Sequence, residues 1–481
     1  MTEDAGQRGL DPEDWEAFRA TAHALLDRCI DRLAAARAAP WRPVPDGLAA
    51  GYALDAAGTG RGEATVAARL AEEVLPHGTG NTHPRFFGWV HGTGLATGLL
   101  SEMVAGTMNA NCGGRDHGAI HLERAVIDWT RRAMGFPDGA SGVLVTGTSQ
   151  ATLLALAAAR VAALGPDSRA TGTRGAPLVA YAGAGVHNAA VKAMEVLGLG
   201  GDALRRLPED GRGLSAEALA AAVARDRAAG LRPFALIASA GSVDLGRFDD
   251  LAALADTARD AGLWLHVDGA YGAWTRLADP PWRSLTDGIG RADSLACDFH
   301  KWMYVPYDCG IVLIRDAARH RAAFAARPAY LAAQEAGLGG GEPWFCDYGI
   351  DLSRGNRALK VWTAIEAYGP DRLGAAITRN CALAARMGAA VSAIPGMRLA
   401  APVVSCICAF TADAGRGAAQ QSALNARIAA ALQLSGEAVF STTVIDGVTC
   451  LRAAITNHRT TEEDVDRAIA AVARARDLGG A

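Results

Sequence analysis

Between about residues 86 and 320, short apolar runs alternate with longer segments in which apolar residues recur at helical spacing. The runs predict strands at 142–146, 177–182, 234–239, 263–268, 294–298 and 310–314, and the longer segments predict helices at 149–163, 187–197, 216–229 and 249–261. Continuously apolar strands are typical of sheets that are covered on both faces. The alternation therefore predicts an α/β fold with a mostly parallel sheet.

The two ends of the chain follow other patterns. Helical spacing over 11–36 and around 63–75, with a proline-rich connector between, predicts an arm that packs on the rest of the chain or on a second subunit. A glycine-rich stretch at 337–341 predicts a loop, and a long helix is expected near 353–368. Short strands at 397–399, 405–410 and 448–455 and a final helix from 461 predict a smaller α+β domain. We expect a helical arm over 1–85, a large domain over 86–370 and a small domain over 371–481.

Composition narrows the class of protein. The 481 residues are 50% hydrophobic and 20% charged, with a net charge of −4, so no basic excess points to nucleic acid. No apolar stretch reaches the roughly 18 residues needed to span a bilayer, and the acidic start does not resemble a signal peptide. Nine cysteines without CxxC pairs fit the reducing cytosol. These features predict a cytoplasmic enzyme with no membrane or nucleic-acid partner.

Two predicted strands end in side chains that carry chemistry. The run 294–298 leads to His300 and Lys301, and the run 263–268 ends in Asp268. Carboxyl ends of parallel strands meet at the edge where α/β sheets bind ligands. Alone, Lys301 could be a surface charge, and Asp268 could be a helix cap or a Mg²⁺ ligand.

Together the two side chains fit pyridoxal phosphate (PLP). Burial lowers the pKa of a lysine and so favours the neutral amine that attacks an aldehyde. A carboxylate at Asp268 would keep the pyridine nitrogen protonated, and the small Ala270 would let a ring lie against the backbone.

A third motif is a strand, a tight turn and a helix at 143–152. Its turn places Gly147, Thr148 and Ser149 at a helix N-terminus, which is a phosphate site or simply a capped helix. The motif also approaches the Gly-x-Ser-x-Gly elbow of serine hydrolases, with His458 available as a base, but Ala151 replaces the last glycine. The hydrolase interpretation leaves Asp268 and Lys301 unexplained.

Histidines give weaker signals. His187 begins a predicted helix at the same end of the sheet, where its ring could stack on an aromatic cofactor, although a single histidine is more often structural. His117 and His121 have i, i+4 spacing but lack the glutamate of a zinc motif, so no metal site is predicted.

Together these motifs resemble the PLP-dependent group II amino-acid decarboxylases. The likeness runs from His83-Pro-Arg-Phe-Phe-Gly to Thr460-Thr-Glu-Glu-Asp and is most specific in Asp-Phe-His-Lys301-Trp, His-Val-Asp268-Gly-Ala-Tyr and Ser149-Gln-Ala-Thr. The resemblance implies fold type I, with a seven-stranded type of sheet in the large PLP domain, and a homodimer with active sites at the interface.

The resemblance also implies roles for single residues. Lys301 would be the Schiff-base lysine, Asp268 the partner of the pyridinium nitrogen, and His187 the residue that stacks on the ring near the substrate carboxylate. Ser242 would lie near the cofactor, and Tyr330, on a loop, would reprotonate the α-carbon. The phosphate would be bound by Gly147, Thr148, Ser149 and His300.

The substrate region departs from the aromatic branch of this family. The segment with Trp89 and His91 keeps one aromatic residue where that branch has more. The segment with Asn111 and Arg115 is polar where that branch is largely apolar. A polar substrate side chain would fit, and Arg115 could bind a carboxylate or simply pair with Asp116.

The expected reaction is decarboxylation of an L-amino acid to its amine through an external aldimine and a quinonoid. Oxidative deamination to an aldehyde and β-elimination are alternatives that use the same groups. Relatives with Phe at the position of Tyr330 resemble aldehyde synthases, so Tyr330 favours simple decarboxylation.

Overall fold

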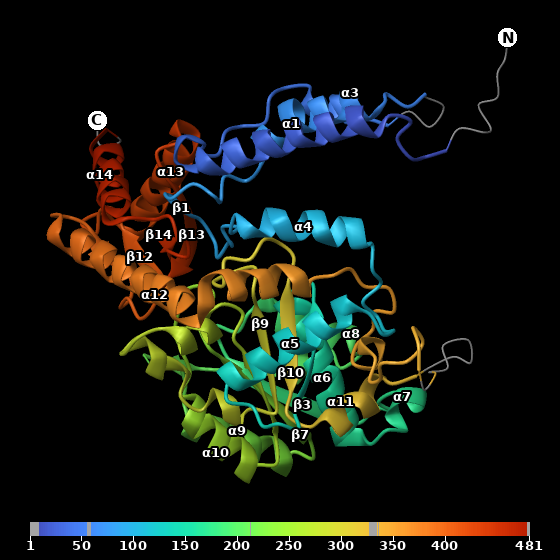
Figure 1. Ribbon diagram of the computed structural model, residues 1–481. Coiled ribbons are helices and arrows are strands. Elements are labelled where there is room, and N and C mark those ends of the chain that lie inside the picture. Colours follow the sequence, from blue (N-terminus) through green and yellow to red (C-terminus); the bar gives the residue numbers. More distant parts are fainter. Residues whose placement is uncertain (1–8, 55–58, 212, 327–333, 335, 479–481) are drawn as a thin grey trace.

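Two large sheets organise the chain, and the N-terminal helices α1 (Trp15–Ala34) and α3 (Glu63–Arg69) lie outside both (Figure 1). A third sheet has only two short strands, β5 (Glu209–Asp210) and β6 (Gly213–Leu214). The computed structural model describes residues 9–54, 59–211, 213–326, 334 and 336–478. Within these residues, no helix is long and apolar enough to cross a membrane.

The larger sheet has seven strands, and only β10 runs antiparallel to its neighbours. Its strands, in spatial order, are β2 (Ser141–Val145), β10 (Gly310–Ile314), β9 (Ser294–Asp298), β8 (Trp264–Asp268), β7 (Arg232–Ser239), β3 (Leu178–Gly183) and β4 (Leu204–Leu207). The predicted α/β class and mostly parallel sheet are confirmed. The sequence did not predict β4, because Arg205 and Arg206 interrupt its apolar pattern at the edge of the sheet.

Helices cover both faces of this sheet, since every residue of β8, β9 and β10 is buried. The helices that follow or precede its strands are α5 (Gly118–Ala133), α6 (Thr148–Leu164), α8 (Asn188–Val196), α9 (Ala216–Ala228), α10 (Leu251–Asp260) and α11 (Ala317–Phe324). Helix α6 packs across β7 to β10, and its small buried residues Ala151, Ala155 and Ala158 permit a close approach. The N-terminus of α6 therefore lies directly beside the ends of the central strands.

The smaller sheet combines the C-terminal part of the chain with one early strand. Its order is β1 (Phe86–Phe87), β13 (Val439–Ile445), β14 (Val448–Ala454), β12 (Ile407–Thr411) and β11 (Arg398–Leu399), and helices α13 (Ala418–Ser435) and α14 (Glu462–Leu478) pack beside it. Because β1 pairs in parallel with β13, residues 86–87 belong to this sheet and not to the large domain that was predicted to begin at residue 86.

Helix α12 (Ala358–Ala393) connects the two sheets. It bends at Gly369, which has φ +68°, followed by Pro370. The predicted helix over 353–368 begins only at Ala358, because the backbone at Arg354 instead exchanges hydrogen bonds with Asn111 and Cys112.

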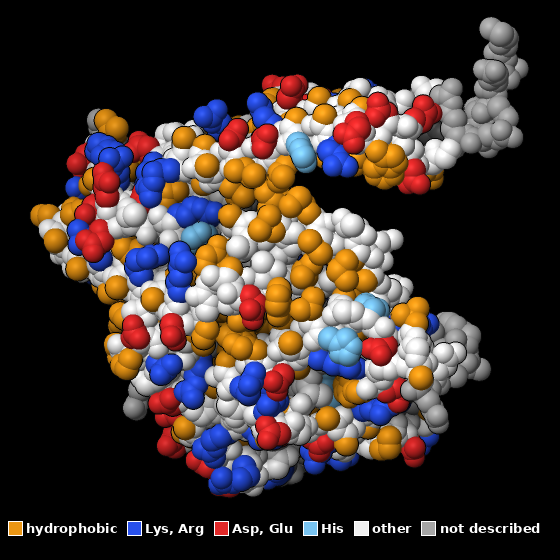
Figure 2. Space-filling view, in the orientation of Figure 1, with side chains coloured by type: hydrophobic (Ala, Val, Ile, Leu, Met, Phe, Trp, Pro, Cys, Tyr) orange, Lys and Arg blue, Asp and Glu red, His pale blue; other side chains and the backbone are white. Residues whose placement is uncertain are grey.

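The arm contains α1 (Trp15–Ala34) and α3 (Glu63–Arg69), which contact each other. No residue of α1 is buried. Helix α4 (Thr97–Met108) is also exposed, with Leu100, Met103, Val104 and Met108 between 42% and 55% accessible. Figure 2 shows apolar side chains gathered around the hollow between the arm and the rest of the molecule.

Candidate active site

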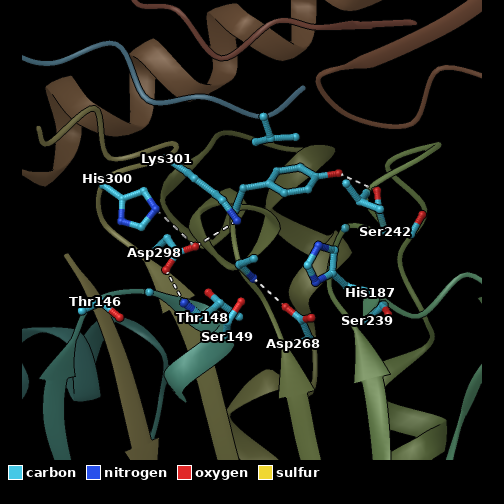
Figure 3. A pocket seen from close by; sticks show the side chains of 16 residues that line it. Thr146, Thr148, Ser149, His187, Ser239, Ser242, Asp268, Asp298, His300 and Lys301 are labelled. Atoms are coloured by element: carbon cyan, nitrogen blue, oxygen red, sulfur yellow. Dashed lines mark hydrogen bonds and ion pairs between the residues drawn. The ribbon is translucent and has the colours of Figure 1, made fainter. Parts of the chain in front are cut away.

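A cavity of about 300 Å³ opens at the carboxyl ends of the central strands of the large sheet. It lies where the sequence predicted a ligand site, with side chains from several strand ends pointing into it (Figure 3). It is lined by Val90, Thr146, Gly147, Thr148, Ser149, His187, Ser239, Gly241, Ser242, Val243, Asp268, Ala270, Tyr271, Asp298, His300 and Lys301.

Strands β8 and β9 are parallel neighbours, and both end at this cavity. Asp268 is the last residue of β8 and is 9% exposed; one of its carboxylate oxygens accepts a hydrogen bond from the amide of Ala270 at 3.1 Å. Asp298 is the last residue of β9, and Lys301 follows three residues later. The topology thus brings an amine and two carboxylates to one cavity.

The environment of Lys301 differs from the sequence-based expectation. Burial does lower the pKa of this amine, but Asp298, whose Oδ2 lies 2.9 Å from Nζ, and the charge of Asp268 raise it. The net effect is a raised pKa, so the expected lowering was wrong. Without a cofactor, Lys301 is therefore an ammonium ion at neutral pH.

Asp268 is affected in the opposite way. Burial raises the pKa of its carboxyl group, while the nearby charges of Lys301 and His187 lower it, and burial dominates. A cationic partner inside the cavity would stabilise the ionised carboxylate, because its positive charge would compensate for the hydration lost on burial.

The turn between β2 and α6 forms a cup of polar groups. Gly147, Thr148 and Ser149 all line the cavity, and the amide of Thr148 donates to Asp298 Oδ1 at 2.7 Å. The Oγ1 atom of Thr148 is buried without a hydrogen-bond partner. A Cβ atom at Gly147 would lie 3.3 Å from Cε1 of His300, so glycine keeps this side of the cup open. A buried hydroxyl without a partner at a helix N-terminus fits an anionic group such as phosphate.

The remaining predicted cofactor residues also surround the cavity. His187 is the N-cap of α8, and its Nδ1 accepts from the amide of Ala189 at 3.2 Å. The hydroxyl of Ser242 accepts from the amide of Arg247 at 3.1 Å, and its carbonyl oxygen accepts from the hydroxyl of Tyr271 at 3.0 Å.

His300 belongs to the loop that follows β9 and lies beside Gly147 of the cup. Its Nδ1 accepts from the amide of Cys309 at 3.1 Å, and its ring centroid is 4.4 Å from that of Tyr307. Burial lowers the pKa of the His300 imidazole. His300 is thus a firmly oriented ring beside the cup, and its burial disfavours the protonated form.

The predicted substrate residues lie outside the cavity lining. The rings of Trp89 and His91 lie in a tilted arrangement with centroids 5.6 Å apart, on either side of Val90, which does line the cavity. Asn111 Oδ1 accepts from the amides of Gly113 and Arg354. The guanidinium of Arg115 lies 4.6 Å from the ring centroid of Trp344. Tyr330 lies outside the described residues.

Several lining residues were not singled out from the sequence, above all Asp298. It stands in the motif Asp-Phe-His-Lys301-Trp and closes an apolar run as Asp268 does, so the sequence carries the same signal for both residues. Tyr271, Ser239 and Gly241 follow or end predicted strands and could have been found in the same way.

Comparison with known proteins identifies the family. The pyridoxal-dependent decarboxylase conserved domain matches residues 59–412, which is more than half of the chain. The chain belongs to the PLP-dependent decarboxylases. The predicted family, cofactor and carboxy-lyase reaction are confirmed, and the match favours this interpretation over the serine hydrolase at Ser149.

Individual relatives span most of the chain. An aromatic-L-amino-acid decarboxylase of Bacillus atrophaeus is 33% identical over 80% of this chain and 79% of its own length. An L-2,4-diaminobutyrate decarboxylase of Rhizobium meliloti is 30% identical over 98% of this chain and 94% of its own. The crystal structure of Oryza sativa TDC with PLP and tryptamine matches with a TM-score of 0.88 at 25% identity, covering 98% of this chain and all of that one.

Proposed function

We propose that this chain decarboxylates an L-amino acid to its amine, with PLP held in the cavity between the Thr148 cup and Asp268. The observation that carries the proposal is the convergence of Lys301, Asp268 and the cup on one cavity. The buried, unpartnered Oγ1 of Thr148 and the desolvated Asp268 are features that a bound phosphate and a pyridinium nitrogen would stabilise.

Each group has a task in this proposal. Lys301 would bond the aldehyde carbon of the cofactor, Asp268 would keep the proton on the ring nitrogen, and His187 would cover one face of the ring. Gly147, Thr148, Ser149 and His300 would bind the phosphate, with Ser242 and Ala270 beside the ring. When bound, PLP supplies an electron-withdrawing ring that accepts the electron pair left as CO₂ departs. Tyr330 would return a proton to the α-carbon.

The decisive test is replacement of Lys301 by alanine. Wild-type protein with PLP should show the visible absorbance of lysine-bound PLP, and Lys301→Ala should lose it together with amine formation. A wild-type protein that never acquires this band would refute the proposal.

The identity of the substrate is tested with a panel of amino acids whose products are identified by mass spectrometry. Aromatic amino acids and L-2,4-diaminobutyrate belong in it, since the relatives are named for both classes. Basic or polar substrates would accord with the polar segment around Asn111 and Arg115.

A second outcome, an aldehyde, also has support, because a phenylacetaldehyde synthase of Arabidopsis thaliana is 30% identical over 82% of this chain. Measuring amine against aldehyde, ammonia and peroxide from one substrate separates decarboxylation, oxidative deamination and elimination. Tyr330→Phe should move product from amine towards aldehyde if Tyr330 is the proton donor. An unchanged product ratio would remove that role.

We further propose that the enzyme is a cytoplasmic homodimer. Exposed apolar residues on the arm (Trp15, Val66, Leu70) and on α4 support an interface there, since contiguous apolar surface marks protein contacts. Among the described residues, no two cysteines are joined by a disulfide, which accords with a reducing compartment. Sedimentation should give a dimer for wild type and a monomer for the double variant Met103→Glu, Val104→Glu.

A further inference from the structure

The amine of Lys301 is paired with a carboxylate that the proposed cofactor chemistry does not use. Its Nζ lies 2.9 Å from Oδ2 of Asp298, and a dashed line marks this contact in Figure 3. The Asp298 side chain is 2% exposed, and that of Lys301 is 24% exposed. The pair is therefore largely shielded from water.

The position of the Asp298 carboxylate is fixed from several directions. Its Oδ1 accepts from the amide of Thr148 at 2.7 Å, and its Oδ2 lies 3.6 Å from Nε2 of His300. A Cβ atom at Gly310 would lie 2.6 Å from Oδ1, and one at Gly147 would lie 3.4 Å away. Gly310 and Gly147 thus leave room for this carboxylate, and the surrounding contacts fix its position.

Other titratable groups also face Lys301. Burial lowers the pKa of its amine and Asp298 raises it, and the charge of Asp268 and the hydroxyl of Tyr307 raise it further. Burial lowers the pKa of His91 and of His300, and the charge of Lys301 adds to this lowering. Within the described part of the chain, only the Asp298 carboxylate forms an ion pair with Nζ. Asp298 is therefore the main partner of the charged amine.

We propose that Asp298 holds Lys301 as an ammonium ion whenever this lysine is not bonded to the cofactor. This rests on the proposed function. Lys301 is not bonded to the cofactor in two situations. One is the enzyme before it takes up PLP, and the other is the stage of turnover at which the substrate amine has replaced Lys301 on the aldehyde carbon.

The proton balance shows what the pair does. During cofactor loading, the Lys301 ammonium loses a proton to solvent, its amine attacks the aldehyde carbon, a carbon–nitrogen double bond forms, and water leaves. During substrate exchange, the proton given up by the substrate ammonium ends on the departing Lys301 amine. Asp298 stabilises the ammonium form of Lys301. It therefore slows cofactor loading at neutral pH, because loading needs the neutral amine. It favours exchange of Lys301 for the substrate, because exchange releases Lys301 as the ammonium ion.

The test measures loading of the full-length apoenzyme. With saturating PLP, the first-order rate at which the visible band appears is followed from about pH 6 to about pH 10. Asp298→Asn keeps an acceptor for the Thr148 amide but removes the charge. We expect its rate at pH 7 to exceed that of wild type by about tenfold or more, with the midpoint of the pH profile moved to lower pH.

A matched control removes a nearby charge that does not touch Lys301. Asp308 pairs with Arg357 at 3.0 Å, and Asp308→Asn should leave the midpoint unchanged. Pyridoxal without its phosphate should show the same shift in Asp298→Asn, which separates the effect on Lys301 from relief of repulsion between Asp298 and the phosphate. A shift seen with PLP but absent with pyridoxal would overturn the proposal.

A second readout needs no cofactor. Acetic anhydride labels the neutral amine of Lys301 in the apoenzyme, and peptide mass spectrometry gives the labelling rate at each pH. The midpoint of this pH profile should move to lower pH in Asp298→Asn. If the asparagine variant does not fold, Asp298→Ser is measured in its place. Equal midpoints in wild type and variant would overturn the role of Asp298. Failure of the wild type to bond PLP would instead refute the proposed function.

Discussion

Arg452 donates a hydrogen bond from Nε to the backbone oxygen of Asp244 at 3.0 Å. Arg452 lies on β14 of the smaller sheet and is 3% exposed. Asp244 directly follows Ser242 and Val243, which line the cavity. The same guanidinium donates to the carbonyl oxygens of Val243 and Trp89. One buried arginine therefore joins the smaller sheet to the cavity of the larger one.

Replacing Arg452 by methionine should weaken both the fold and cofactor binding. The carbonyl groups would lose their donor, and each buried unsatisfied group costs roughly 1–3 kcal/mol, so we expect a loss of about 2–4 kcal/mol in the free energy of unfolding. The loop with Ser242 would also be less well held, so PLP should dissociate more readily. Urea denaturation and PLP titration measure the two effects.

Thr443→Val is the matched control for Arg452. Its hydroxyl donates a single exposed hydrogen bond, of 2.8 Å, to the side chain of Asp244. This variant should lose about 1 kcal/mol or less and bind PLP normally. Similar losses in both variants would mean that Arg452 does not hold the loop.

Asp268→Asn should separate stability from activity. Burial raises the pKa of Asp268, so the charged carboxylate is unfavourable in the fold without a cationic partner. The apoenzyme should therefore be at least as stable as wild type, while kcat falls by about 100-fold or more because asparagine cannot stabilise a protonated ring nitrogen. Thermal unfolding of the apoenzyme and kcat of the holoenzyme measure the two quantities. A variant that is both destabilised and fully active would contradict this assignment.

The sequence predicted the parts of the site that depend on strand ends. Asp268 and Lys301 follow continuous apolar runs, and such runs become central parallel strands whose ends meet at one edge. The pKa of Lys301 was wrongly predicted because it depends on the direction of one side chain, Asp298, which no pattern along the chain gives. Asn111 and Arg115 were predicted as substrate residues from the resemblance, and in the structure their side chains contact the segment around residues 344–354.

Buried histidines should make the protein sensitive to acid. Burial lowers the pKa of His266 and of His320 to about 3 each, and both side chains are fully buried. Below the ordinary value of about 6.5, these histidines take up protons in the unfolded chain but stay neutral in the fold. Because the unfolded state then binds more protons, stability falls as the pH decreases from about 6.5 towards 3.

The size of this effect can be tested with one variant. Between about pH 7.5 and 5.5, each of the two histidines should contribute about 1 kcal/mol to the loss of unfolding free energy. His320 forms hydrogen bonds with the Ser141 hydroxyl and the Tyr348 carbonyl. The variant His320→Gln should be less stable at pH 7.5, but its free energy of unfolding should fall less on acidification. Exposed His23 on α1 provides the control, since His23→Gln should change neither quantity. Urea denaturation at both pH values gives the difference, and a His320→Gln slope equal to that of wild type would show that His320 is not the source.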